Sequence, residues 1–197
     1  MYTLRLLALL LLGCLAFGGS ASAAGMKLQD YEVGNYPIGG DFTLTNQDGG
    51  KTSLKDFRGK VVLLAFGYTH CPDVCPTTLA QFKQVHQALG KDGAKLQALF
   101  ISVDPKRDTP AHLKQYVGYF DPTFVALTGK PAELKQTIER YMGKYRIRET
   151  NSAAGYFVDH TAFIYLIDPQ GKVRYLFSPD VDRNVLLAGV QAVLAGK

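Results

Sequence analysis

The chain has 197 residues, of which 47% are hydrophobic, and it carries 22 basic and 17 acidic residues. This hydrophobic fraction excludes a disordered chain and suffices for about one globular domain with its own hydrophobic core. The basic residues are scattered along the sequence, so we expect no nucleic-acid partner. Three cysteines, one of them near the N-terminus, exclude a structural disulfide framework.

The first 23 residues have the pattern of an export signal. Arg5 precedes an apolar run over 6–17, and small residues follow up to Ala23. This order predicts cleavage after Ala23 and a periplasmic domain. The run is shorter than the roughly 20 residues that span a bilayer. An alternative interpretation is a lipoprotein signal, because Leu11-Leu12-Gly13-Cys14 resembles a lipobox, and lipidated Cys14 would then tether the domain to the inner membrane.

The next segments alternate between linker, strand and helix patterns. Residues 24–36 have no clear period and are interpreted as a linker, so the folded domain is expected over 37–197. Residues 41–45 and 51–52 flank a turn and predict an N-terminal hairpin. The apolar run 61–66 predicts a central strand covered on both faces. Pro76 then opens a predicted helix that ends near Gly90.

The alternation continues to the C-terminus. Strands are predicted at 99–103 and 124–127, each followed by a helix that begins at Pro110 or Pro131. Segments 162–167 and 173–177 flank a turn at 168–171, and a last helix covers 182–195. The order predicts an α/β, thioredoxin-like fold: a central mixed sheet flanked by helices, with an extra N-terminal β-hairpin and a β-hairpin insertion or extension.

Cys71 and Cys75 are the residues on which the functional interpretation depends. They lie in Tyr68-Thr69-His70-Cys71-Pro72-Asp73-Val74-Cys75-Pro76, directly after the predicted central strand. The start of the following helix favours a thiolate at Cys75. Two sulfurs at this spacing can share one soft metal ion or close to a disulfide. The motif has one residue more than the redox Cys-x-x-Cys motif, so both possibilities stay open.

His160 is the third candidate ligand, 85 residues after Cys75. In thioredoxin-like folds the loop before the corresponding strand faces the cysteine pair and usually carries a cis-proline. This chain has no proline there, and His160 lies within a residue or two of that point. A Cys2His ligand set suits copper(I) or zinc, although no fourth ligand for zinc is evident.

Other polar residues near these motifs are weaker candidates. His70 is either an alternate ligand or base, or a solvated loop residue, and His86 and His112 are expected on helix surfaces. Asp73 and Asp159 either orient ligands or are ordinary loop carboxylates. The segment 104–108 follows a central strand and is expected at the same sheet edge as the cysteines, as a helix cap or as a partner-docking loop.

Several segments together resemble one family, the Sco/SenC copper chaperones of cytochrome c oxidase assembly. The match runs from about Ile38 to the C-terminus and rests on segments 39–44, 59–61, 67–76, 102–110 and 159–161. The resemblance implies one copper ion, as Cu(I) or Cu(II), bound by Cys71, Cys75 and His160. It also implies delivery to the dinuclear copper A site of oxidase subunit II, an upstream copper donor and a thiol reductant. Many relatives keep a membrane anchor, whereas this chain shows a short signal.

Three functions are compatible with the residues. The first is a copper metallochaperone, and the second is a thiol-disulfide oxidoreductase that uses Cys71 or Cys75 to reduce the cysteines of the copper A site or of other exported proteins. The third is a peroxidase, because Val74-Cys75-Pro76-Thr77 is similar to the peroxiredoxin motif, but Pro72 replaces the threonine expected three residues before the cysteine. The sequence favours the first, and whether the chain is an enzyme stays open.

Overall fold

A computed structural model describes residues 26–151 and 155–196 of the chain. The predicted leader over 1–23, including Cys14, lies outside these ranges, so its cleavage and lipidation stay predictions. Among the described residues, no helix has both the length and the apolar character needed to span a membrane.

A mixed seven-stranded sheet, in the order β2-β1-β5-β4-β3-β8-β9, forms the centre of the fold. Its strands are β1 (Thr43–Asn46), β2 (Lys51–Ser53), β3 (Val61–Gly67), β4 (Leu96–Ser102), β5 (Val125–Thr128), β8 (Ile164–Ile167) and β9 (Val173–Phe177). β3, β4 and β5 are parallel, whereas β1 pairs with β5, and β8 with β3, in antiparallel fashion. The predicted α/β architecture and its N-terminal β1–β2 and C-terminal β8–β9 hairpins are therefore confirmed.

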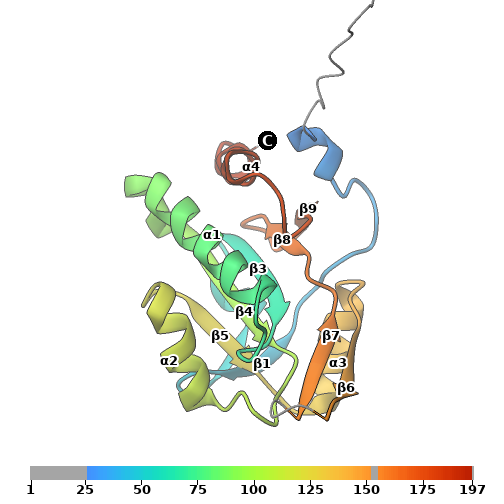
Figure 1. Cartoon of the computed structure of the whole chain (residues 1–197). Helices are drawn as coiled ribbons and strands as arrows, with labels where there is room; N and C mark the ends of the chain where they lie inside the picture. The colour runs from blue at the N-terminus through green and yellow to red at the C-terminus, as the bar shows by residue number, and fades with distance from the viewer. Residues whose placement is uncertain (1–25, 152–154, 197) are drawn as a thin grey trace, which may run out of the picture.

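Helices cover both faces of the sheet (Figure 1). They are α1 (Val74–Ala88), α2 (Pro110–Phe120), α3 (Pro131–Arg140) and α4 (Arg183–Leu194), with short 3-10 turns η1 (Leu28–Tyr31), η2 (Leu54–Phe57) and η3 (Gly90–Lys95). α1 and α2 each connect parallel neighbours, and such crossovers are right-handed, which puts both helices on one face. α4 packs against α1 on that face, and α3 lies on the other (Figure 1).

β3 is buried along its whole length, as the apolar run predicts, and its alternate residues face different layers. On the α3 face, the Phe66 ring lies 5.8 Å from that of Tyr141 and 5.7 Å from that of Tyr165. The two buried hydroxyls keep hydrogen bonds: Tyr141 donates to the carbonyl of Gly40, and Tyr165 donates to that of Tyr141. Gly67 faces the opposite layer, toward α1.

The first turns of α1 and α2 show how the sequence positions the loops beside the sheet. α2 begins as predicted, with Thr109 as its N-cap and Pro110 at the first helical position. α1 begins two residues before the predicted Pro76, at Val74. A proline is tolerated there because the first N–H groups of a helix have no intrahelical acceptor. Cys75 therefore lies inside the helix rather than at its cap.

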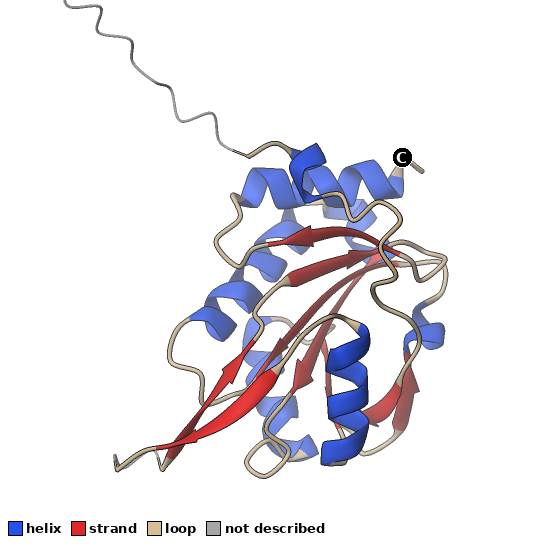
Figure 2. Cartoon of the chain, turned by 90° about the vertical axis from the view of Figure 1, so that its right-hand side faces the viewer, coloured by secondary structure: helices blue, strands red, loops and turns tan. Residues whose placement is uncertain are grey.

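A separate two-stranded hairpin joins β6 (Tyr145–Glu149) to β7 (Tyr156–His160). These two strands are not among the predicted elements: Tyr145 and Ile147 alternate with Arg146 and Arg148, but the alternation is confined to five residues, four of which are exposed. The hairpin projects beyond the main sheet (Figure 2). His160, predicted in a loop, is the last residue of β7 and pairs with Tyr145.

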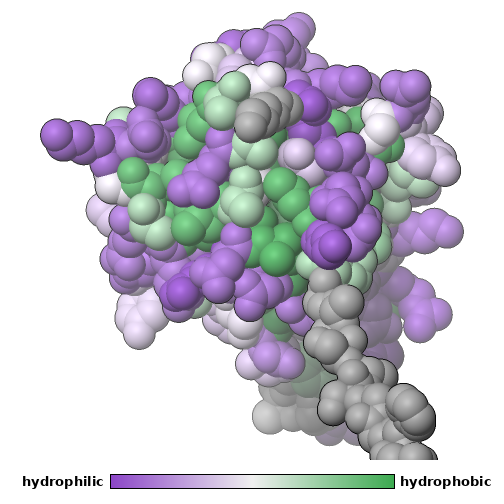
Figure 3. All heavy atoms as spheres, turned by 90° about the horizontal axis from the view of Figure 1, so that it is seen from above, coloured by the Kyte–Doolittle hydropathy of each residue, from purple (hydrophilic) through white to green (hydrophobic). Residues whose placement is uncertain are grey.

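The segment 24–36, interpreted as a linker, contains η1 in its described part. This turn packs against α4 and β9, and the amide of Val33 donates to the carbonyl of Arg174 at 3.0 Å. Seen from the end that carries η1 and α4, apolar residues lie among hydrophilic ones (Figure 3). Residues 28–33 are thus structured against the domain.

Candidate metal centre

Cys71, Cys75 and His160 converge at one end of the sheet. Their sulfur atoms and one imidazole nitrogen all lie within 4.8 Å of one another, and Cys75 Sγ is 3.5 Å from His160 Nε2. The turn after β3 supplies Cys71, the first turn of α1 supplies Cys75, and the end of β7 supplies His160. The structure therefore brings together all three residues that the sequence singles out as ligands.

The two cysteines differ in their access to solvent. Cys71 is half-buried, whereas Cys75 is only 3% exposed. The backbone amide of Cys71 donates to the carbonyl of Tyr68 at 3.2 Å, which closes the turn after β3. Both thiols are free. An incoming group would therefore meet Cys71 first.

Gly67 makes room for the sulfur of Cys75. A Cβ atom on Gly67 would lie 2.7 Å from Cys75 Sγ and 2.6 Å from Cε2 of Phe100, closer than non-bonded atoms approach. The end of β3 therefore needs a residue without a side chain for α1 to place Cys75 against it.

The two thiols share one proton near neutral pH. The pKa of Cys71 is lowered to about 4, chiefly because the Cys75 thiol donates a hydrogen bond to it. The pKa of Cys75 is raised, because that same hydrogen bond holds its proton, and burial and the charge on Cys71 add to the effect. The metal-free reduced site thus presents a Cys71 thiolate beside a Cys75 thiol. The predicted thiolate at Cys75 is therefore wrong, because burial and the hydrogen bond to Cys71 outweigh the effect of the helix N-terminus.

The imidazole of His160 is oriented for ligation. Its Nδ1 lies 3.1 Å from the carbonyl oxygen of Thr161, which can only accept, so the ring proton is assigned to Nδ1. Nε2 then faces the cysteines with its lone pair free for an ion, as in metal-binding histidines whose other ring nitrogen donates to a carbonyl. The ring of Tyr68 packs edge-on against that of His160, with centroids 5.8 Å apart.

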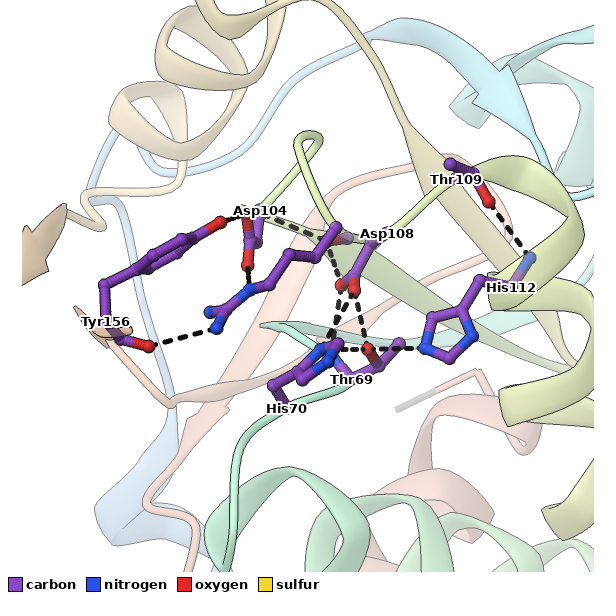
Figure 4. Close-up of polar contacts among 9 residues, drawn as sticks. Thr69, His70, Asp104, Asp108, Thr109, His112 and Tyr156 are labelled. Carbon is purple, nitrogen blue, oxygen red and sulfur yellow. Dashed lines mark hydrogen bonds and ion pairs between the residues drawn. The ribbon is translucent and has the colours of Figure 1, made fainter. Parts of the chain in front are cut away.

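A buried polar cluster connects the loop after β4 to β7, the strand that carries His160 (Figure 4). Asp104, 2% exposed, accepts hydrogen bonds from the Tyr156 hydroxyl at 2.7 Å and from Arg107 Nε at 2.5 Å. The Arg107 guanidinium stacks 3.6 Å from the Tyr156 ring centroid and donates to the Tyr156 carbonyl at 3.0 Å. Asp104 lies at the sheet edge where its position after a buried strand predicts it, but its contacts with the hairpin have no signal in the sequence.

The weaker candidates lie outside this centre. His70 Nδ1 faces Asp108, at 4.0 Å, rather than the cysteines. Asp159 forms ion pairs with Arg146 and Arg148 on the neighbouring strand. Asp73 is the N-cap residue of α1. A hollow of about 700 Å³ between α3 and β6 contains none of the three ligand candidates.

The geometry fits one ion held by three ligands. Around an ion with bonds of roughly 2.0–2.3 Å, ligand atoms in a plane stand about 3.5–4 Å apart, which matches the Cys75–His160 separation. Two sulfurs and one imidazole form a soft, low-coordinate set suited to Cu(I). Zinc would require a fourth ligand, and no further His, Cys, Asp or Glu joins the cluster among the described residues.

Known proteins resemble the chain over most of its length. The "SCO2-like protein" of Rickettsia felis is 39% identical over 139 residues, which cover 70% of this chain and 68% of that protein. The copper-bound structure of Bradyrhizobium japonicum ScoI is 44% identical, with a TM-score of 0.72, and the match covers 79% of this chain and 99% of that one.

A third relative, BsSco, is described as a member of the Sco family of cytochrome c oxidase assembly proteins with a disulfide switch. It is 27% identical, with a TM-score of 0.63, and the match covers 85% of this chain and 95% of that one. The likeness to Sco structures confirms the predicted thioredoxin-like fold. The family described as SCO1/SenC matches residues 31–195, and the chain therefore belongs to the SCO1/SenC family.

Proposed function

We propose that this protein is a copper metallochaperone that binds one copper ion through Cys71, Cys75 and His160. The observation that carries the proposal is the 3.5 Å approach of His160 Nε2 to Cys75 Sγ, with Cys71 Sγ in the same cluster. The copper-bound structure of the similar Bradyrhizobium japonicum ScoI supports copper as the ion. Cu(I) suits the thiolates best, and Cu(II) is the other oxidation state to test.

Copper is here a cargo, and we propose that the copper A site of cytochrome c oxidase subunit II receives it. Membership in the SCO1/SenC family and the described role of BsSco in oxidase assembly support this destination. The half-buried Cys71 is the ligand that a partner's cysteine can displace first, while Cys75 and His160 still hold the ion. Loading requires an upstream copper donor and a thiol reductant, since a Cys71–Cys75 disulfide has no thiolate to offer.

A transfer experiment tests the destination. The copper(I)-loaded protein is mixed with the soluble domain of oxidase subunit II, the two are separated, and copper is measured in each. We expect copper in the subunit II domain in amounts that match the loss from the donor. If a variant of the subunit II domain without the two copper A-site cysteines received as much copper as the wild-type domain, directed delivery would be refuted.

The asymmetry of the thiols favours a second function, thiol-disulfide exchange. The Cys71 thiolate would attack a partner disulfide and release one partner thiolate, and deprotonated Cys75 would then attack Cys71 Sγ. The products are a Cys71–Cys75 disulfide and a partner dithiol. The disulfide switch described for BsSco supports this reading. Reduction of an oxidised subunit II domain by the metal-free protein would support it, and loss of that reaction in a Cys71→Ser variant would assign the nucleophile.

Cys75, the counterpart of a peroxidatic cysteine, is buried and has a raised pKa, so we do not propose a peroxidase.

We propose a periplasmic location on the pattern of residues 1–23 alone. Cell fractionation of the wild type and of a Cys14→Ser variant tests it. Membrane association that depends on Cys14 would favour the lipoprotein interpretation, and a cytoplasmic protein would contradict both.

A further inference from the structure

A second group of ligand-type side chains surrounds the hydroxyl of Thr69, on the loop that carries Cys71 (Figure 4). Thr69 Oγ1 lies 2.6 Å from Asp108 Oδ1, 3.0 Å from His70 Nδ1 and 2.9 Å from His112 Nε2. These three ligand atoms lie within 4.8 Å of one another. They come from the turn after β3, the loop before α2 and the first turn of α2, so the fold brings them together from three segments.

In the absence of a metal, the Thr69 hydroxyl can hydrogen-bond to Asp108, His70 and His112 at the same time. It has one proton, which goes to the Asp108 carboxylate, because a carboxylate only accepts. It can then accept from both rings, which assigns protons to His70 Nδ1 and His112 Nε2. A neutral imidazole can move that proton to its other nitrogen, so each ring can offer a lone pair at the same place without a net loss of a proton.

Asp108 is the fixed member of the cluster. Its side chain is 0% exposed and its Oδ2 accepts from the amide of Thr69 at 3.0 Å and from Ser102 Oγ at 2.5 Å. In the part of the chain that the structure describes, the basic group within 4.0 Å of this carboxylate is His70. Three hydrogen bonds from Thr69 and Ser102 hold the carboxylate in place, and a bound cation would pair with its negative charge.

We propose that His70, Asp108 and His112 form a second metal site, which holds Cu²⁺ next to the cysteine centre. Two imidazoles and one carboxylate suit divalent ions, and Cu²⁺ binds such donors most strongly in the first-row series. The ion takes the place of the Thr69 hydroxyl, which turns away by rotation about χ1. The solvent-accessible rings of His70 and His112 then move to bind the ion. The site shares no ligand with Cys71, Cys75 or His160, although His70 and Cys71 are neighbours in the chain.

The test uses a background variant, Cys71→Ser, Cys75→Ser and His160→Ala, without a purification tag, so that the cysteine centre contributes nothing. Cu²⁺ is titrated against a competing chelator, and the complex is examined by electron paramagnetic resonance. In the same background, His112→Ala removes one ligand. His86→Ala is the matched control, because His86 pairs with Asp121 at 3.1 Å on another part of the surface. Circular dichroism checks that each variant is folded.

We expect one Cu²⁺ per chain with hyperfine coupling to nitrogen, and affinity at least about tenfold lower in the His112→Ala variant than in the His86→Ala variant. No bound Cu²⁺, or equal affinities in these two variants, would overturn the proposal and leave the cluster as a hydrogen-bonded anchor for the loop. Because the background lacks the cysteine centre, neither result bears on copper delivery itself.

Discussion

At Gly67, the absence of a side chain determines where the sulfur of Cys75 can lie. The strand β3 ends there, directly beneath the first turn of α1, and a Cβ atom would overlap both Cys75 Sγ and the Phe100 ring. The backbone conformation at Gly67 is not in the left-handed region, so the requirement is one of space alone. The glycine in Gly67-Tyr68-Thr69-His70-Cys71 is thus explained by packing against the candidate ligand.

We predict that Gly67→Ala weakens copper(I) binding at least about tenfold and lowers the free energy of unfolding by about 1–3 kcal/mol, because overpacking displaces the sulfur. Gly118→Ala is the matched control: Gly118 lies in α2 with open space around it, and alanine is the better helix residue there. Chelator competition and urea unfolding measure the two quantities. Unchanged copper affinity in Gly67→Ala would show that the sulfur has room to move.

The pKa difference between the two thiols makes the reactivity of Cys71 nearly independent of pH around neutrality. In the metal-free reduced protein the pKa of Cys71 is about 4, so Cys71 is a thiolate throughout the range from pH 6 to 8. For an ordinary thiol, with a pKa near 8.5, the thiolate fraction falls about tenfold for each pH unit below that value. We therefore expect the rate of Cys71 alkylation by iodoacetamide to change little between pH 8 and pH 6.

Mass spectrometry identifies the alkylated cysteine, and Cys75→Ala is the comparison. Without the hydrogen bond from Cys75, the pKa of Cys71 should rise and the rate should fall with decreasing pH over the same range. A tenfold fall per pH unit in the wild type would contradict the shared-proton description.

Among the elements, the β6–β7 hairpin carries His160, and its two strands are not predicted from the sequence. In its β6 strand, only Tyr145 and Ile147 alternate with polar residues, and the strand is mostly exposed, so the local signal is short and weak. By contrast, the buried run of β3 and the Thr109-Pro110 start of α2 carry local signals that need no tertiary information. His160 was predicted near the cysteines from the general layout of the fold. The strand that holds it depends on the contacts of Tyr156 with Asp104 and Arg107.

We predict that Tyr156→Phe loosens the hairpin. Removing the hydroxyl takes one hydrogen bond from the buried carboxylate of Asp104, at a cost of about 1–3 kcal/mol in the free energy of unfolding. Amide hydrogen exchange in β7 should then become faster. Tyr119→Phe, at a side chain that is 84% exposed, is the control and should leave both quantities unchanged. Equal exchange rates in β7 of the two variants would show that the cluster does not hold the hairpin.

The topology of the sheet assembles the candidate metal centre from distant parts of the chain. Parallel β3 and β4 bring the cysteine turn and the 104–108 loop to one sheet edge, and this could be predicted because both follow buried strands. The burial of Asp104 and Asp108 could not be predicted, since in the sequence they are ordinary turn and cap residues. Their surroundings are created by the hairpin and by Thr69, which are distant in sequence.

We propose that Cys71, Cys75 and His160 together bind one copper ion. The most direct test is a titration of the reduced protein with copper(I) against a chromophoric chelator, beside the His160→Ala variant and the His86→Ala control. We expect one tightly bound copper per chain, an affinity at least about tenfold lower in the His160→Ala variant, and no change in the His86→Ala variant. Binding that is weak and indifferent to His160 would contradict it and would leave a dithiol reductase as the better description.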